Sequence, residues 1–169
     1  MTRAPTAECW LPDDIRVGRS DIAGQGLFTT ASIPQGTVVS RLGGRLVSTA
    51  ELRALMAGPD YVDSIAVDED VHLLLAPGNR NRFGNHSCEP NLWWSDEYTL
   101  VARRDIVAGE ELASDYSTST ADPQFVLRCH CETYRCRQMV TGDDWRIPQL
   151  QQVYAGHWIP LLRRRVGGL

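Results

Sequence analysis

The 169-residue chain contains no lysine, so all 17 of its basic side chains are arginines, a bias typical of a GC-rich genome. It has no apolar run of membrane-spanning length, and no apolar core of a signal peptide follows Met1. We therefore expect a cytoplasmic protein without membrane association. The net charge of −4 provides no strong field for nucleic acid, so we expect no direct nucleic-acid binding.

Long helical patterns are also scarce, and residues 12–116 consist mainly of short strand patterns separated by glycine and proline turns. Strands are expected at 15–19, 37–40, 71–75, 92–94 and 100–103. One short helix is expected over 49–56, with Thr49 as its N-cap. The length allows one domain with a real core. The predicted fold class is mainly β with short helices.

The character of the chain changes after Tyr116. A polar linker at 117–123 precedes a cysteine-rich loop, and a C-terminal segment follows that loop. Pro148 suits the first position of a helix there. We expect Trp145, Tyr154 and Trp158 to pack this segment on the domain, and the arginines at 163–165 to form a solvated tail. The predicted boundaries are 1–120, 121–138 and 139–169.

Five cysteines are present, and disulfides are not expected in a reducing cytosol. Cys129, Cys131 and Cys136 lie in one short loop, and Cys88 supplies a fourth thiolate, a set suited to tetrahedral zinc. The alternatives are buried free thiols, a redox pair, or His130 in place of one ligand. Cys9 is left over as an ordinary thiol.

Four motifs occur in a fixed order, and together they resemble the SET-domain methyltransferases that carry a post-SET cysteine loop. They are Gly24-Gln25-Gly26, the run RFGNHSCEPN from Arg82 to Asn91, the run GEELASDY from Gly109 to Tyr116, and the cysteine loop ending at Arg137. The resemblance covers roughly residues 14–137. It implies a β-clip-like fold with a pseudoknot, in which residues 85–88 are threaded near the end of the domain, followed by a zinc-bound post-SET loop and a helical extension. From the short, regulator-free architecture we expect an enzyme of a bacterial type.

The resemblance also implies S-adenosylmethionine as cofactor and a lysine amine of a protein or peptide as methyl acceptor. Tyr116 is then the catalytic tyrosine at the methyl-transfer channel. The implied cofactor-binding residues are Gly24, Gln25, Gly26, Arg82, Phe83, Asn85 and His86. Cys88, Cys129, Cys131 and Cys136 are the implied zinc ligands, and the zinc would couple folding of the loop to cofactor affinity.

Methyl transfer from a sulfonium requires a neutral amine in line with the methyl group. A lysine of pKa ~10.4 must give up a proton at pH 7, which costs about 4.6 kcal/mol. A dry channel and the positive sulfonium lower that pKa, so no strong base in the chain is required. A tyrosine hydroxyl can orient the amine without carrying a charge. A lysine-free enzyme would also offer no lysine of its own as a target.

The chain departs from the family pattern at three positions. Gly84 stands where an apolar residue is usual, and Gln138 replaces the common glycine after Cys136-Arg137. Ser114, two positions before Tyr116, replaces an aromatic residue that influences the number of methyl groups added. A wider amine channel follows unless Tyr61, Trp93 or Trp94 fills the space.

The leading functional hypothesis is therefore a protein-lysine N-methyltransferase. One alternative is a methyltransferase for a free amino acid, a peptide or another small amine. A second alternative is a binding module that keeps the fold without catalysis, although Tyr116, Asn85 and both glycines argue against it.

Overall fold

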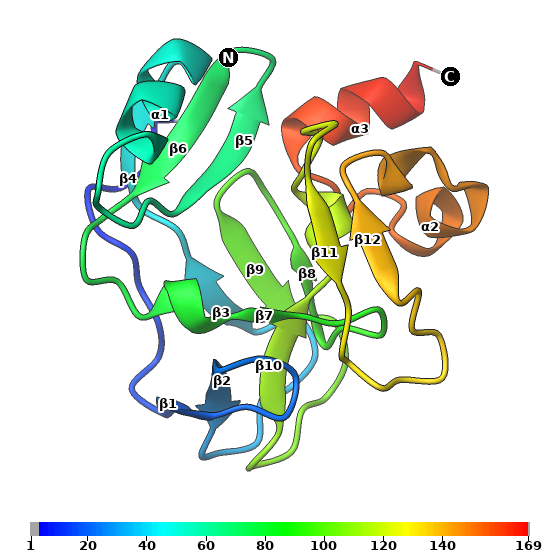
Figure 1. Cartoon of the computed structure of the whole chain (residues 1–169). Coiled ribbons are helices and arrows are strands. Elements are labelled where there is room, and N and C mark those ends of the chain that lie inside the picture. Colours follow the sequence, from blue (N-terminus) through cyan, green and yellow to red (C-terminus); the bar gives the residue numbers. More distant parts are fainter. Residues whose placement is uncertain (1–3, 169) are drawn as a thin grey trace.

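The computed structural model describes residues 4–168 and contains four small β-sheets with short helices around them (Figure 1). Within these residues no helix combines the length and apolar character that crossing a membrane requires. The strands are β1 Ile15–Arg19, β2 Gln25–Thr29, β3 Val38–Arg41, β4 Gly44–Val47, β5 Ser64–Asp68, β6 Val71–Leu75, β7 Asn85–His86, β8 Leu92–Trp94, β9 Thr99–Ala102, β10 Glu111–Ser114, β11 Val126–Arg128 and β12 Met139–Thr141.

The helices are all short. The α-helices are α1 Thr49–Met56, α2 Pro148–Val153 and α3 Pro160–Gly167, and the 3₁₀ turns are η1 Asn81–Phe83, η2 Tyr116–Thr118 and η3 Asp144–Arg146. The prediction of Thr49 as N-cap of the first helix is wrong by one residue. Ser48 has the extended backbone of a cap, and its hydroxyl accepts a hydrogen bond from the Glu51 N–H at 3.2 Å.

Strand β10 organises the sheet that carries the motif residues. The four-stranded sheet has the order β1-β2-β10-β7, in which β10 is antiparallel to β2 and parallel to β7. The parallel pairing sets Ala113 opposite Asn85 and Ser114 opposite His86. Two motifs that are distant in the sequence therefore meet side by side at the centre of the molecule (Figure 1).

The side chain of Asn91 completes this pairing. Its amide donates to the Glu111 carbonyl at 2.8 Å, and its side-chain oxygen accepts from the Ala113 N–H at 3.0 Å. The buried amide thus satisfies one donor and one acceptor of β10 in the manner of a neighbouring strand. This role gives a physical reason for an asparagine at the end of the RFGNHSCEPN run.

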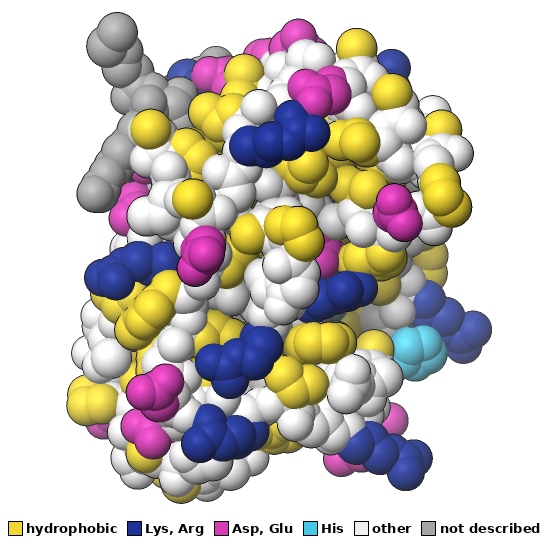
Figure 2. All heavy atoms as spheres, turned by 90° about the vertical axis from the view of Figure 1, so that its left-hand side faces the viewer, with side chains coloured by type: hydrophobic (Ala, Val, Ile, Leu, Met, Phe, Trp, Pro, Cys, Tyr) yellow, Lys and Arg dark blue, Asp and Glu magenta, His cyan; other side chains and the backbone are white. Residues whose placement is uncertain are grey.

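The other sheets have the orders β3-β9-β8, β4-β6-β5 and β11-β12. The β4-β6-β5 sheet with α1 forms the upper left part of Figure 1, and β11, β12 and α2 lie on the right. Figure 2 shows the left face of that view, where basic, acidic and hydrophobic side chains are interspersed.

The C-terminal segment belongs to the main hydrophobic core. Trp145, Tyr154 and Trp158 are buried together with Leu161 and Leu162 of α3, in one cluster with strand residues such as Ile15 and Leu112. The expected packing of the aromatic residues is confirmed. Residues 163–165 lie in helix α3 and not in a tail, so that part of the expectation is wrong. Their side chains are solvated as expected, Arg163 and Arg164 being exposed and Arg165 half-buried, and two of these arginines form surface ion pairs with Asp68 and Glu69.

Candidate functional site

The turn between β1 and β2 provides one wall of the candidate site. Gly24 has φ +50°, a left-handed conformation that favours glycine, and its carbonyl accepts from the Ser20 N–H at 3.0 Å. At Gly26 a Cβ atom would lie 2.2 Å from Oε1 of Glu111. A glycine at position 26 therefore leaves room for the Glu111 carboxylate, and Gln25 between the two glycines begins β2.

The side-chain amide of Asn85 faces that turn. Its nitrogen lies 2.7 Å from Glu111 Oε1, 3.0 Å from Ser20 Oγ, and 3.0 and 3.2 Å from the carbonyl oxygens of Gln25 and Ala23. Four acceptors thus surround a group that has only two N–H bonds. Ser20 also donates to the Glu111 carboxylate at 2.8 Å. The cluster has a surplus of acceptors and suits a ligand with additional N–H donors.

Tyr116 begins η2, with one residue between it and the end of β10, and both its hydroxyl and its backbone N–H are hydrogen-bonded. Its hydroxyl donates to the Gly84 carbonyl at 2.7 Å, and its backbone N–H donates to Nδ1 of His86 at 3.1 Å. Burial, with smaller contributions from Tyr61 and Asp63, raises the pKa of Tyr116 to about 12. The hydroxyl is therefore neutral at physiological pH, and its oxygen keeps lone pairs for a further donor.

His86 joins Tyr116 to the cysteine cluster. Because Nδ1 accepts from Tyr116, the ring hydrogen belongs on Nε2, which lies 3.3 Å from the sulfur of Cys88. Burial lowers the pKa of His86 to about 4, although the nearby Asp115 carboxylate acts in the opposite direction. The ring is therefore neutral, and both of its nitrogens are engaged.

The four predicted zinc ligands come together. The sulfur atoms of Cys88, Cys129, Cys131 and Cys136 all lie within 4.8 Å of one another, and those of Cys88 and Cys129 are 3.8 Å apart. Tetrahedral zinc with Zn–S bonds of about 2.3 Å requires sulfur–sulfur distances of about 3.8 Å. The cluster therefore fits zinc, and His130 is not among the four grouped residues.

Two backbone N–H groups also point at these sulfurs. The Arg137 N–H donates to Cys88 at 3.3 Å, and the Cys131 N–H donates to Cys129 at 3.4 Å. Gln138, which follows, has φ +61°, a conformation that a glycine adopts at lower cost. This backbone conformation explains why a glycine is common at this position in the family. Cys9 lies elsewhere, where its thiol donates to the Gly43 carbonyl at 3.3 Å.

Asp115 connects the tyrosine, the cysteine loop and the C-terminal segment. Arg137 binds it with two hydrogen bonds of 2.7 Å, Ser117 donates from its backbone and hydroxyl, and the Tyr154 hydroxyl donates at 3.0 Å. Burial alone would raise the pKa of Asp115, but the hydrogen bonds and charge of Arg137 outweigh it and lower that pKa. Arg137 also contacts Asp144 at 3.0 Å.

The remaining predicted residues differ in their exposure and in the contacts that they make. The guanidinium of Arg82 is 4.3 Å from the ring centre of Tyr61, which is 71 % exposed, and it also lies over the Phe83 ring. Ser114 is half-buried in β10. Trp94 is buried in the core and Trp93 stacks on His157, so both are held by other contacts.

Sequence reasoning did not assign roles to Ser20, Glu111, Asp115 and Tyr154. Glu111 and Asp115 lie inside the GEELASDY run, so their place in that motif was the available signal. Ser20 and Tyr154 reach the site from 91 and 39 residues away, respectively, from the carboxylates they bind. No local pattern marks such contacts.

The fold and the site thus combine a mainly β domain with a half-buried, hydrogen-bonded tyrosine and a four-cysteine cluster. The SET domain family matches residues 24–117, more than half of the chain. The chain therefore belongs to the SET domain family. The predicted family and fold class are confirmed.

Among curated relatives, the chain is 33 % identical over 150 residues to the histone-lysine N-methyltransferase ash1 of Drosophila melanogaster. It is 34 % identical over 143 residues to human histone-lysine N-methyltransferase 2B. The matches cover 78 % and 75 % of this chain, respectively, but only 6 % and 5 % of those much longer relatives.

Solved structures of similar fold include the following two. The methyltransferase domain of the human histone-lysine N-methyltransferase SETMAR has a TM-score of 0.62 at 27 % identity, covering 76 % of this chain and 58 % of that one. The crystal structure of KRYPTONITE in complex with mCHG DNA and SAH has a TM-score of 0.59 at 28 % identity. It covers 76 % of this chain and 29 % of that one.

Proposed function

We propose that the protein is an S-adenosylmethionine-dependent protein-lysine N-methyltransferase. The observation that carries this proposal is the Tyr116 hydroxyl, half-buried, neutral and fixed on the Gly84 carbonyl beside Asn85 and His86, in a chain of the SET domain family. The relatives above are named histone-lysine N-methyltransferases, and one similar structure contains SAH, the demethylated form of the cofactor.

The acceptor cluster around Asn85 fits the cofactor. The Glu111 carboxylate and the carbonyl groups of Ala23 and Gln25 would accept from the ammonium group at its methionyl end. Close backbone approach at Gly24 and Gly26 would leave space beside it. When bound, S-adenosylmethionine supplies a methyl group on a sulfonium, which is transferred by in-line displacement.

The chain itself contributes position and a dry environment. Because the Tyr116 hydrogen is directed at Gly84, the oxygen can accept an N–H of the incoming amine and orient the nitrogen lone pair. His86 has both ring nitrogens engaged and does not act as the base. The amine therefore loses its proton to water before transfer, which burial in the channel favours.

The zinc cluster would hold the cysteine loop as a wall of the site. We propose that Cys88, Cys129, Cys131 and Cys136 bind a structural zinc, with His86 and the Arg137 backbone as donors to the Cys88 thiolate. We also propose that the zinc-binding loop is a separate unit that spans residues 121–138, between the SET domain and the C-terminal segment.

A calorimetric titration tests the cofactor site. We expect zinc-replete protein to bind S-adenosylmethionine, and Glu111→Gln to weaken binding about tenfold or more, because a charged hydrogen-bond acceptor is lost at unchanged shape. The matched control is Glu110→Gln. That neighbouring carboxylate pairs with Arg104 at 2.6 Å and not with Asn85. Absence of cofactor binding by the wild type would reject methyl transfer of either kind and leave only the non-catalytic binding module.

A further inference from the structure

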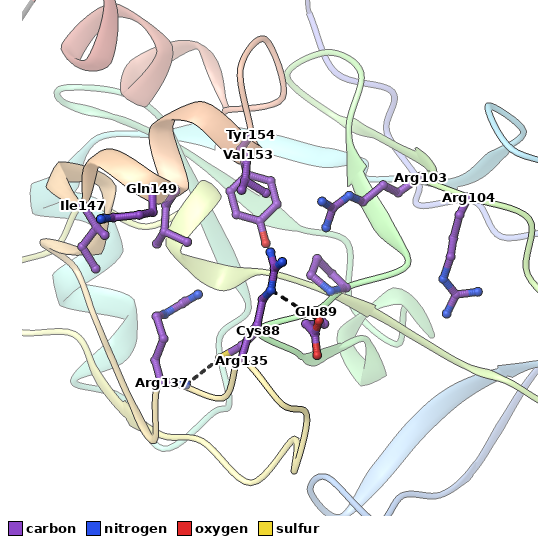
Figure 3. Close-up of a pocket in the computed structure, with 12 residues that line it drawn as sticks. Cys88, Glu89, Arg103, Arg104, Arg135, Arg137, Ile147, Gln149, Val153 and Tyr154 are labelled. Atoms are coloured by element: carbon purple, nitrogen blue, oxygen red, sulfur yellow. Dashed lines mark hydrogen bonds and ion pairs between the residues drawn. The ribbon is translucent and has the colours of Figure 1, made fainter.

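A cavity of about 540 Å³ lies between three parts of the chain (Figure 3). One wall comes from the segment that follows β7, with Glu89 and Pro90, and from the end of β9. The second wall comes from the cysteine loop and the third from the C-terminal segment around α2. None of the residues predicted to bind cofactor lines it, although Cys88, Arg137 and Tyr154 of the site described above do, so it adjoins that site on the side away from the predicted cofactor residues.

The lining of this cavity is basic. Four arginines reach it, Arg103, Arg104, Arg135 and Arg137, against one acidic side chain, Glu89. Arg137 is neutralised by Asp115 and Asp144, and Arg104 by Glu110. Arg135 approaches Glu89 only to 3.8 Å, with both side chains exposed. Such an exposed pair contributes little energy and leaves Arg135 available to a ligand.

Arg103 is the distinctive member of the four. Among residues 4–168 no carboxylate lies within ion-pair distance of it. Its guanidinium lies over two aromatic rings, 5.4 Å from the centre of Trp93 and 5.5 Å from that of Tyr154. Figure 3 shows it extending into the cavity toward Tyr154. An arginine whose guanidinium lies over aromatic rings and has no carboxylate partner can still donate its N–H groups to an anionic oxygen group.

The opposite wall is apolar. Ile147, Leu150 and Val153 line it from the C-terminal segment, and Pro90 adds apolar surface from the domain. A nucleic-acid backbone would make no favourable contact with this apolar wall. The net charge of −4 of the whole chain also disfavours a nucleic acid as the ligand. A peptide in which acidic and aliphatic side chains alternate matches both the free arginine and the apolar surface.

We propose that this arginine-lined cavity binds an acidic, aliphatic-flanked segment of a protein partner, with a carboxylate on Arg103. If the partner is the protein substrate that is methylated, this inference rests on the proposed function. The cavity would then bind that substrate at a second point, outside the amine channel. The C-terminal segment, which lies beyond the family match, then has a role in selecting the substrate.

The test uses a fluorescein-labelled peptide of alternating glutamate and leucine, with fluorescence anisotropy measured on the full chain without cofactor. We expect Arg103→Gln to weaken its binding tenfold or more, since a charge-assisted contact is lost. Arg163→Gln is the matched control, because it removes the same charge from an exposed site on α3. Gln149→Glu, at the exposed edge of the cavity, should weaken binding a few-fold without disturbing the fold.

Equal binding by the Arg103→Gln and Arg163→Gln variants would overturn the proposal, as would equal binding of a lysine–leucine peptide. Displacement of the probe by single-stranded DNA or inorganic phosphate at lower concentration would also overturn it, by indicating a phosphate site. If thermal unfolding shows that Arg103→Gln does not fold, the Gln149→Glu variant provides the test. Unchanged peptide binding by that variant would then overturn the proposal. Because the probe contains no lysine and no cofactor is present, failure of methyl transfer would leave this result intact.

Discussion

At the scale of single residues, Asp115 makes the contacts that connect most of the site. It is fully buried, and it binds Arg137 of the cysteine loop and Tyr154 of the C-terminal segment while preceding Tyr116 in the chain. A buried carboxylate stabilises the fold only while its hydrogen-bond donors are present, because an unpaired buried charge is strongly destabilising. The orientation of Tyr116 therefore depends on groups from three parts of the sequence.

We predict that Asp115→Asn lowers the free energy of unfolding by about 3 kcal/mol at pH 7, because Arg137 loses its principal partner. The pKa of Asp115 is lowered in the folded protein, so its contribution is fully present above the unfolded pKa of about 3.9. It is lost as the pH falls through the folded pKa. When the free energy of unfolding is measured in urea between pH 6 and pH 3, the difference between wild type and variant should therefore become smaller as the pH falls.

Asp143→Asn is the control for this series. Asp143 pairs with Arg146 at 3.1 Å, but both side chains are more than half exposed. Its removal should cost less than about 1 kcal/mol at any pH. If the difference in free energy of unfolding between wild type and Asp115→Asn became larger as the pH falls, the assigned direction of the pKa shift would be contradicted.

Ser114 bears on the number of methyl groups transferred. Of the three aromatic residues that could fill the space beside it, Trp93 stacks on His157, Trp94 is buried in the core and Tyr61 lies against Arg82. Under the proposed function, Ser114→Phe should narrow the channel and shift the product toward fewer methyl groups. Mass spectrometry of the product measures this, and an unchanged methyl distribution would count against a channel at Ser114.

At the scale of elements, the cysteine loop is joined to the domain through Cys88 and Arg137. The loop has little apolar surface of its own, and its small cluster consists of Cys88, Cys129 and Val140 with a few half-buried neighbours. A metal bond can therefore supply much of its folding energy. Loss of the metal should loosen the wall of the site as well as the loop.

We predict that wild type and Cys9→Ser purify with one zinc per chain and that Cys131→Ser does not. Chelation should lower the melting temperature of the wild type by at least about 5 °C and weaken cofactor binding, because the metal is coupled to folding of the loop. Metal analysis by mass spectrometry and thermal unfolding provide the readouts. Equal zinc content in the two serine variants would show that the four-sulfur cluster is not the metal site.

At the scale of the whole molecule, the sequence predicted the parts that short motifs encode. The RFGNHSCEPN and GEELASDY runs and the cysteine spacing indicated the family, and the four sulfurs do come together. Apolar patterns placed five of the twelve strands, β1, β3, β6, β8 and β9, since side-chain periodicity is local. The N-cap was misplaced because Ser48 and Thr49 are both good caps, and only the backbone geometry separates them.

The parts that could not be predicted depend on contacts between distant residues. The bond from Tyr154 to Asp115, the approach of Ser20 to Glu111 and the pairing of α3 with Asp68 and Glu69 have no counterpart in local sequence. The cavity is of the same kind, because its walls come from three separate segments. The C-terminal segment thus contributes to the core and to a second candidate site.

The central claim is methyl transfer to protein lysine with Tyr116 as the orienting hydroxyl. The direct test is transfer of labelled methyl from S-adenosylmethionine to a cell lysate, followed by hydrolysis and identification of the labelled amino acid in the protein and small-molecule fractions. Because the chain contains no lysine, labelled methyl-lysine cannot come from the enzyme's own side chains.

We predict labelled methyl-lysine in the protein fraction, reduced at least about 100-fold in rate by Tyr116→Phe, since positioning of the amine is lost. Tyr134→Phe should leave the rate unchanged, because that tyrosine is 99 % exposed. Label confined to small amines would contradict a protein substrate. An undiminished rate with Tyr116→Phe would contradict the role assigned to the tyrosine.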